Sequence, residues 1–313
     1  TYYNAKTMNQ TFNPELPVGE YARIYIQTGA VRNQGLELAL NYNNTWKDFT
    51  WNTGVTYSMN KNKILTLADN AINPITGEKF SISSLNMGGL GSTRFILKEG
   101  GSMGDIYSLM DLKRDANGAV YIDENNSVVT ESLEANNYIK LGSVLPKGNL
   151  AWRNNFSWKN INVAFLVSAR LGGVVFSRTQ AVLDNFGVSE ASAAARDKGY
   201  VSVNGNDRVN PEGWYSVVAG GTAVPQYYIY SATNIRLQEA SIGYTIPRKW
   251  LGNVCDIKVS LIGRNLWMIY NKAPFDPESV ASTDNFYQGI DYFMMPSLRN
   301  ICLLYTSDAA DDR

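Results

Sequence analysis

The feature that most constrains the fold is an alternation of apolar and polar residues through most of residues 34–61. Nearly every second side chain is apolar or aromatic in residues 36–42, and again in residues 49–58. A period of two over this length predicts two β-strands, each with one apolar and one polar face. The connection between them, residues 43–48, is short and polar, so we expect the two strands to pair as a hairpin.

The length and the aromatic content of this hairpin favour a membrane setting. Each strand is about ten residues long, which is enough to cross a bilayer when the strand is tilted. Tyr42, Trp46, Phe49 and Trp51 gather near the turn. Outer-membrane barrels place such a belt of aromatic residues at the boundary between lipid and water.

Composition narrows the function classes. The chain has 313 residues, 28 basic and 28 acidic side chains and no His, and this zero net charge argues against a nucleic-acid partner. The absence of His excludes histidine-based catalysis and most zinc sites. Cys255 and Cys302 are far apart and predict no disulfide framework. We expect no transmembrane helix, because no run of about eighteen apolar residues occurs. No signal peptide precedes Thr1, so we interpret the chain as a fragment.

Similar patterns predict roughly nine strands in total. Beyond the first hairpin we expect them at residues 93–98, 105–114, 150–158, 161–171, 235–246, 256–267 and from 297 onward. A shift of the apolar frame predicts a bulge near Glu239. Residues 1–17 are expected to be irregular, residues 21–27 to form a short strand inside a loop, and residues 189–198 to form a helix with Ser189 as its N-cap.

The connections alternate between short and long. Short turns are expected at residues 43–48, 99–104, 159–160 and 247–254, and long polar loops at 61–90, 115–145, 172–230 and 268–296. Short periplasmic turns and long extracellular loops are typical of outer-membrane barrels. A soluble β-sandwich or a secreted adhesin would also alternate apolar and polar positions. Long strands, aromatics near the turns and uncharged polar faces favour the barrel.

Six segments also resemble a known family. They read VRNQGLELALNYN (31–43), EGGSMGDIYSL (99–109), LGSVLPKGNLAWRNNFSWKN (141–160), ARLGGVVF (169–176), IRLQEASIGYTIP (235–247) and GRNLWMIYNKAPFDPES (263–279). In this order they resemble the C-terminal barrel part of the SusC/RagA group of TonB-dependent outer-membrane transporters from Bacteroidetes. The resemblance implies an all-β fold: an antiparallel transmembrane β-barrel fragment, with the missing strands and the plug domain upstream. Large barrels of this type close with about 22 strands.

The resemblance also implies a function. It implies active import of oligosaccharides, sometimes peptides, across the bacterial outer membrane, in which the TonB complex pulls on the missing plug domain. A SusD-like surface lipoprotein would cap the barrel, and outer-membrane lipid would surround it. No cofactor is implied, and no nucleophile–base pair stands out, so we expect no enzyme activity. A passive porin and a secreted glycan-binding β-domain remain as alternatives.

Candidate binding residues are the aromatics of two long outer loops, residues 172–230 and 268–296. They are Trp214, Tyr215, Tyr227, Tyr228, Phe286 and Tyr287. Exposed aromatics could stack on sugar rings or bury against a partner, but they could equally pack the loops on themselves.

Other polar groups have mainly structural interpretations. Arg170 and Arg236 are expected to face the lumen, where structural pairing, for instance with plug carboxylates, is favoured over substrate contact. Asp115, Asp123 and Glu124 could hold Ca²⁺, but they lack the EF-hand pattern, so a solvated turn is favoured and no metal is predicted.

The last twelve residues break the pattern. Residues 301–305 form one unbroken apolar run, and residues 307–313 are polar and acidic. We therefore expect the C-terminal portion of the barrel to occupy residues 1–301. Residues 302–313 resemble a translated sequencing adapter and are expected to be a non-native tail.

Overall fold

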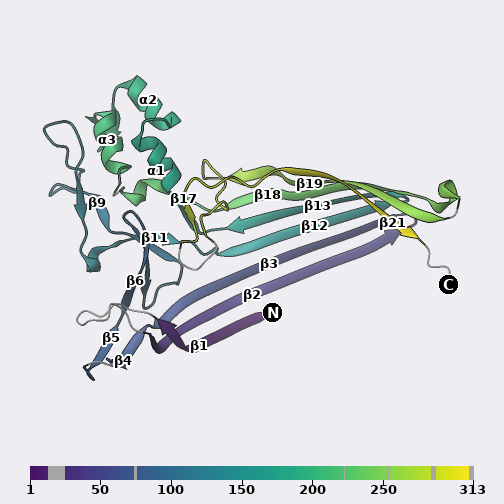
Figure 1. Ribbon diagram of the computed structural model, residues 1–313, viewed down its shortest axis with the longest axis horizontal. Coiled ribbons are helices and arrows are strands. Elements are labelled where there is room, and N and C mark those ends of the chain that lie inside the picture. The colour runs from purple at the N-terminus through teal and green to yellow at the C-terminus, as the bar shows by residue number, and fades with distance from the viewer. Residues whose placement is uncertain (13–24, 74–75, 222, 253, 283–286, 310–313) are drawn as a thin grey trace.

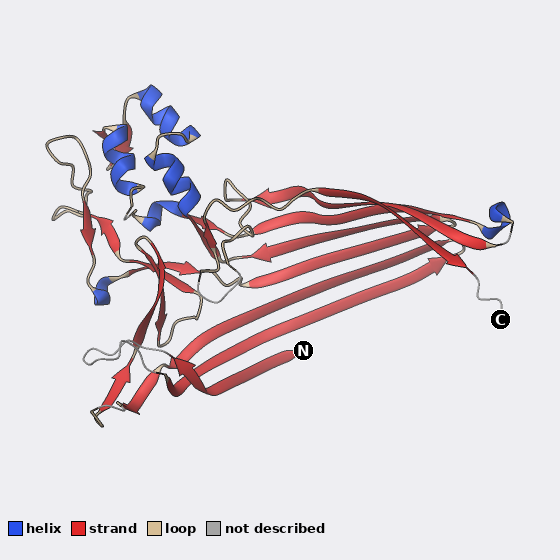
Figure 2. Ribbon diagram, viewed as in Figure 1, coloured by secondary structure: helices blue, strands red, loops and turns tan. Residues whose placement is uncertain are grey.

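The computed structural model describes residues 1–12, 25–73, 76–221, 223–252, 254–282 and 287–309. A long, twisted antiparallel sheet carries a smaller folded body at one end, and all of the helices but one short turn lie in that body (Figures 1 and 2). We call the sheet the wall. We call the body, which comprises the described residues within 67–147, 172–233 and 272–299, the cap.

The wall has eight strands, and their order in the sheet follows their order in the chain. They are β1 (Tyr2–Phe12), β2 (Ile26–Trp46), β3 (Phe49–Thr66), β12 (Gly148–Trp158), β13 (Ile161–Leu171), β18 (Asn234–Ile246), β19 (Cys255–Asn271) and β21 (Asn300–Ala309). Each is antiparallel to its neighbours. The predicted antiparallel β-barrel fragment is confirmed, with eight wall strands in place of roughly nine.

Cross-strand register divides the wall into an apolar and a polar face. One row of directly opposed residues crosses six strands: Leu40, Val55, Trp152, Val167, Leu237 and Trp267. These large side chains are not buried beneath anything, because Leu40 is 73% exposed and Trp267 is 62% exposed. The neighbouring positions, such as Asn41 and Arg153, point to the opposite face.

Aromatic rings cluster where the wall ends in short turns. Trp46 stacks on Phe49 with ring centroids 6.0 Å apart, and Trp51 stacks on Phe156 at 6.2 Å. Only two residues connect β2 to β3 and β12 to β13, and the first of each pair, Lys47 or Lys159, is left-handed. Such tight turns match the twist of the strands they join. At the remaining short connection a 3₁₀ turn, η3 (Arg248–Leu251), links β18 to β19.

The cap is a folded body with its own core. Its helices are α1 (Arg178–Asn185), α2 (Glu190–Lys198) and α3 (Pro211–Val218), with 3₁₀ turns η1 (Ala135–Asn137) and η2 (Pro225–Tyr228). Its strands are β4 (Ala68–Ile72), β5 (Lys79–Ile82), β6 (Ser84–Leu90), β7 (Thr93–Lys98), β8 (Asp105–Ser108), β9 (Met110–Leu112), β10 (Thr130–Ser132), β11 (Ile139–Ser143), β14 (Val174–Ser177), β15 (Val201–Val203), β16 (Asp207–Val209), β17 (Ile229–Ser231) and β20 (Ile290–Asp291).

Side chains from all three cap segments meet in that core. Phe95, Leu112, Phe176, Val218 and Ile290 are each at most 2% exposed and belong to one cluster. Among the described residues, no helix has both the length and the hydropathy needed to cross a membrane. The three long connections therefore pack together into one folded unit. The sequence analysis predicted separate polar loops and did not predict this packing.

One predicted hairpin is misplaced. Residues 93–98 and 105–114 were expected to be wall strands joined by a periplasmic turn, but β7 and β8 lie in a cap sheet of order β11-β8-β7-β6. The physical reason is burial on both faces: Phe95, Ile96, Leu97 and Ile106 are all at most 4% exposed. Because the two misassigned strands form a pair, the alternation of short and long connections in the rest of the wall is unaffected.

The first residues are also corrected. Residues 2–12 were expected to be irregular, yet they form β1, which pairs with β2 from Tyr2 opposite Leu36 to Phe12 opposite Ile26. Polar residues such as Asn4 and Lys6 on the face of Tyr2 hid the alternation. Residues 21–24 of the predicted short strand lie outside the described residues, and Ile26 and Gln27 begin β2.

Two local predictions are confirmed. Ser189 caps α2, where its side chain accepts a hydrogen bond from the amide of Ser192. The register of β18 shifts between Leu237 and Glu239, which is the predicted bulge. The helices α1 and α3 were missed.

Candidate functional site

The aromatic candidates fall into different environments within the cap. The Trp214 ring meets the Tyr227 ring edge-on, with centroids 5.2 Å apart. Trp214 also packs against the cap core, whereas Tyr227 remains 40% exposed. This pair therefore serves the packing of the cap and still presents one tyrosine to solvent.

Tyr228 lies at the centre of a buried polar cluster. It is 3% exposed, and its hydroxyl donates a hydrogen bond of 3.0 Å to the carboxylate of Asp184. Asp184 also accepts hydrogen bonds from Gln180 and from the hydroxyl of Ser189. Burial, together with the nearby carboxylate of Asp184, raises the pKa of Tyr228 far above its ordinary value. The Tyr228 ring is enclosed and offers no face to a ligand.

Tyr215 lines a cleft of about 480 Å³ between the helices. Phe186, Arg196 and Glu212 also line this cleft, and Phe186 is 74% exposed. Burial raises the pKa of Tyr215, with a further contribution from Asp184. The cleft is thus mixed in charge and bordered by two aromatic rings.

The remaining two candidates are neighbours in the chain. Tyr287 is 43% exposed and its ring lies 6.3 Å from the Phe95 ring, while Phe286 lies outside the described residues. The sequence interpretation did not single out Tyr292 and Phe293, which are 48% and 56% exposed and meet edge-on. The signal available was the apolar run at residues 292–295 within a polar loop.

The polar face of the wall is hollowed. A depression of about 770 Å³ lies on it, lined by side chains from several strands and from the cap. Its polar lining includes Glu37, Ser58, Asn149, Ser168, Arg170, Gln238 and Glu278. The face that would look into a barrel lumen therefore offers donors and acceptors, whereas the opposite face is apolar.

The two lumen-facing arginines are paired within this chain. Arg236 is 4% exposed and its guanidinium contacts Asp276 at 2.9 Å and Glu278 at 3.1 Å. Arg170 donates a hydrogen bond of 2.8 Å to the carbonyl of Val144. Structural pairing, favoured from the sequence over substrate contact, is what the structure shows for Arg236.

The Arg264 segment serves the wall as well. Arg264 lies within β19 and donates a hydrogen bond of 2.9 Å to Glu239 on the neighbouring strand. Asn265 is left-handed and donates to the carbonyl of Leu298, and Trp267 points to the apolar face.

The acidic loop from Asp115 uses its carboxylates for its own turns. Asp115 accepts hydrogen bonds from the amides of Asn117 and Ala119, and Asp123 accepts from those of Asn125 and Ser127. Within the part of the chain that the structure describes, no three acidic or thiol side chains gather at metal-binding distances.

Comparison with known proteins adds sequence and fold relatives. No family model matches the chain. TonB-dependent receptor P3 of Formosa agariphila is 25% identical over 342 residues, covering 96% of this chain and 31% of that protein. TonB-dependent receptor P26 of the same organism is 27% identical over 326 residues, covering 96% of this chain and 32% of its own length.

This chain resembles a TonB-dependent receptor. The solved structure of the RagAB peptide transporter matches with a TM-score of 0.68 and 16% identity over 98% of this chain and 33% of that one. The RagAB peptide importer in its closed-closed state matches with a TM-score of 0.69 at the same identity. The fold is that of a transporter β-barrel, and the resemblance expected from the six segments is confirmed. The chain spans about a third of the length of the curated relatives.

Proposed function

We propose that this chain forms part of the wall and the outer surface of a TonB-dependent importer in the bacterial outer membrane. The observation that carries the proposal is the wall itself, whose exposed side chains are apolar on one face while its polar face is hollowed. A water-soluble sheet would instead cover such an apolar face. The relatives are receptors and transporters, which agrees with a role in transport without enzyme activity.

The proposal fixes an orientation. The aromatic belt near Trp46 and Trp158 marks the periplasmic boundary of the lipid, and the cap stands on the outside of the cell. A plug domain, contributed by another part of the protein, fills the lumen and connects to the TonB complex. The polar face of the wall then surrounds the plug and the cargo.

For the cargo we propose oligosaccharides, delivered together with a SusD-like lipoprotein that docks on the cap. Peptides are the second candidate, because the RagAB structures to which the chain is similar are those of a peptide transporter, also described as a peptide importer. The Ser, Asn and Gln side chains of the hollow can hydrogen-bond to sugar hydroxyls and to peptide groups alike. Uptake assays must therefore include both classes.

The test of import uses the full-length protein in outer membranes. Uptake of fluorescent oligosaccharide and peptide pools is measured with and without a functional TonB complex. We expect uptake of one class that disappears without TonB. Uptake that persists without TonB would indicate a passive porin instead, and a protein that is monomeric in water without detergent would indicate a secreted β-domain.

The docking of a lipoprotein is tested on the exposed tyrosines of the cap. Tyr227→Ala and Tyr287→Ala should weaken co-purification with the lid lipoprotein, because aromatic anchors contribute most to such interfaces. Tyr121→Ala is the control, since Tyr121 is also a cap tyrosine and is 41% exposed. Unchanged co-purification of both variants would contradict the docking role of these residues.

A further inference from the structure

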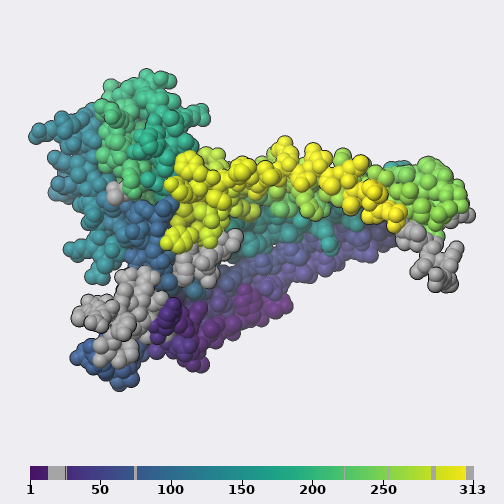
Figure 3. Space-filling model, in the orientation of Figure 1, coloured from purple at the N-terminus to yellow at the C-terminus, as the bar shows by residue number. Residues whose placement is uncertain are grey.

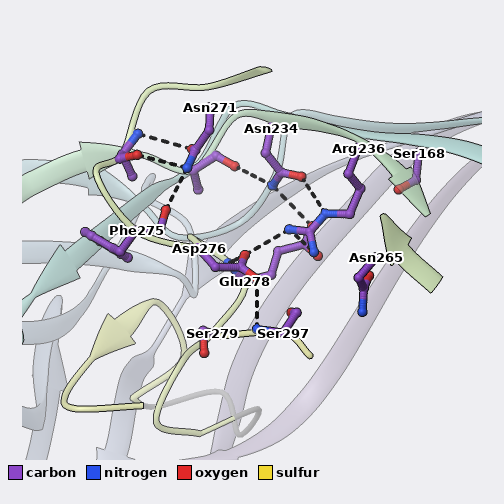
Figure 4. A network of polar contacts seen from close by, with 12 residues as sticks. Ser168, Asn234, Arg236, Asn265, Asn271, Phe275, Asp276, Glu278, Ser279 and Ser297 are labelled. Atoms are coloured by element: carbon purple, nitrogen blue, oxygen red, sulfur yellow. Dashed lines mark hydrogen bonds and ion pairs between the residues drawn. The ribbon is translucent and has the colours of Figure 1, made fainter. Parts of the chain in front are cut away.

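Residues 272–282 and 287–299 of the cap, which we call the strap, are fastened to the wall by a buried ion-pair network. Arg236 of β18 reaches Asp276 and Glu278 of the strap, and its Nε donates to the side-chain oxygen of Asn234 at 3.2 Å (Figure 4). Asn234 in turn donates to Glu278 at 3.2 Å. The two carboxylates at the start of the strap, Asp276 and Glu278, therefore meet at one arginine.

Hydrogen bonds shape the strap around the same point. Asp276 accepts bonds from the amides of Glu278 and Ser297, so the outgoing and returning arms of the strap meet at one carboxylate. Burial opposes the ionisation of Asp276, but hydrogen bonds from Ser297, Glu278 and Arg236 outweigh it and hold its pKa below the ordinary value. Asn271 closes the start of the strap by donating to the carbonyls of Ala273 and Phe275.

The other end of the strap is bound to the cap. Strand β20 pairs in parallel with β14, and the hydroxyl of Ser177 donates a buried bond of 2.6 Å to Asp291. The amide of Phe293 donates to the hydroxyl of Thr179 in α1. Beyond this point the chain leaves the cap and returns along the edge of the wall, as the yellow residues in Figure 3 show.

The network lies on the polar face of the wall. Arg236 is directly opposite Ser168 on β13, and both alternate with apolar neighbours that point the other way. Glu278 of the strap also lines the hollow on this face, next to Ser168 and Arg170. The strap therefore crosses the lumenal side of the wall at the end that carries the cap.

We propose that Arg236 is a positioning residue that holds the strap across the outer mouth of the lumen and thereby connects the cap to the wall. The strap narrows access to the hollow from outside, and a movement of the cap is transmitted to the lumenal face through it. This inference rests on the proposed function, because only a barrel gives the polar face a mouth.

Arginine suits this task for a stereochemical reason. Its planar fork presents several N–H donors at fixed angles, so one side chain can satisfy Asp276, Glu278 and Asn234 together. A lysine ammonium is a compact point charge without this fork, so it would satisfy only part of this set. Removing the guanidinium would leave Asp276 buried without its cation, which favours release of the strap into water.

The test measures access to a cysteine beneath the strap. In the full-length protein, Ser168→Cys is placed in a background in which every native cysteine, including Cys255, is replaced by Ala, and intact cells are treated with a membrane-impermeant maleimide. Arg236→Met should raise the labelling rate by about tenfold or more, since it shifts a local opening equilibrium. Arg236→Lys should give an intermediate rate.

A matched control is available on the neighbouring strand. Arg264→Met also removes a lumenal arginine paired with a carboxylate, but its partner Glu239 belongs to the wall and not to the strap. This variant should label at the parent rate. If Arg236→Met does not assemble, Glu278→Gln, which retains the contact between Arg236 and Asp276, takes its place and should still raise the rate.

The labelling assay tests the strap, and the import assay tests the proposed function, so a failure of one can be distinguished from a failure of the other. Faster labelling of Arg236→Met without any import by the parent protein would support the strap and overturn the proposed cargo transport. Normal import with equal labelling of Arg236→Met, Arg264→Met and the parent would overturn the strap. Equal acceleration by both variants would also overturn it, because the effect would then be a general loosening of the wall.

Discussion

A decisive prediction concerns Leu40, an exposed residue that should behave as though it were buried. In the structure, Leu40 is 73% exposed and lies directly opposite Val55 in the apolar row of the wall. If this face meets water, Leu40→Arg should change stability by no more than about 0.5 kcal/mol, as surface substitutions usually do. If it meets lipid, an arginine near the bilayer midplane costs about 2–4 kcal/mol.

The neighbouring residue supplies the control. Asn41 alternates with Leu40 and lines a polar depression together with Asn52 and Arg153. Asn41→Arg keeps the new charge in the polar lumen and should cost far less. The difference of about 2–4 kcal/mol between the two variants corresponds to roughly 30- to 900-fold in the folding equilibrium.

The assay is reversible folding of the full-length protein into lipid vesicles. The folded fraction is read at increasing urea concentrations from its slower migration in unheated electrophoresis. We expect Leu40→Arg to lower the urea midpoint strongly and Asn41→Arg to leave it close to that of the parent. Equal midpoints for the two variants would refute the assignment of the apolar face to lipid.

Three further predictions concern the cap, the strap and the tail. Phe95→Ala removes a ring that is fully enclosed in the cap core and should cost about 3–5 kcal/mol, measured as faster hydrogen exchange of cap amides with unchanged exchange in the wall. The pKa of Asp276 in the folded protein lies below its ordinary value of 3.8, so the stability that its carboxylate gives the strap is complete above pH 3.8 and is lost as the pH falls through the folded pKa. Hydrogen exchange of the strap amides, corrected for its intrinsic pH dependence, should therefore become faster in that acidic range in the parent and not in Asp276→Asn. We propose that residues 302–313 are not native, and resequencing the locus should recover polar residues in place of Cys302 and Leu304, which oppose Ile262 and Ser260 on the polar face; finding the same codons in genomic DNA would contradict this.

The wall could be predicted from the sequence because lipid and water impose one rule on every strand. A wall residue is either on the apolar face or on the polar face, so the period of two survives across Leu40, Val55 and Trp152 regardless of their partners. Among the wall strands, this rule failed to predict the strand in which polar residues occupy positions of the apolar face. In β1, Asn4 and Lys6 lie opposite Gln34 and Arg32, and that strand was missed.

The cap could not be predicted because no such rule applies to it. Its strands are short, and β7 is buried on both faces, so its apolar run looks the same as a wall strand in the sequence. Its helices are eight or nine residues long, and although all three begin at a side-chain N-cap, only α2 follows that cap with a run of alanines. What holds these pieces together is a core built from segments far apart in the chain, since Phe95 and Ile290 belong to the same buried cluster.

The same difference between local pattern and long-range contact explains why some candidate site residues are exposed and others are buried. Aromatic residues in a long loop carry no local mark that separates an exposed ring from a core ring, because both are compatible with any backbone pattern. Tyr227 and Tyr228 are adjacent, yet one is 40% exposed and the other 3% exposed. The difference arises from Asp184, a residue of α1 that gives the hydroxyl of Tyr228 a buried acceptor and thereby makes its burial tolerable. Arg236 is the corresponding case on the wall. Alternation places its side chain on the lumenal face, but its partners Asp276 and Glu278 come from the strap, which the pattern of β18 does not reveal. The role of such residues therefore depends on partners that are far away in the sequence. The strap joins the wall, which could be predicted from the sequence, to the cap, which could not.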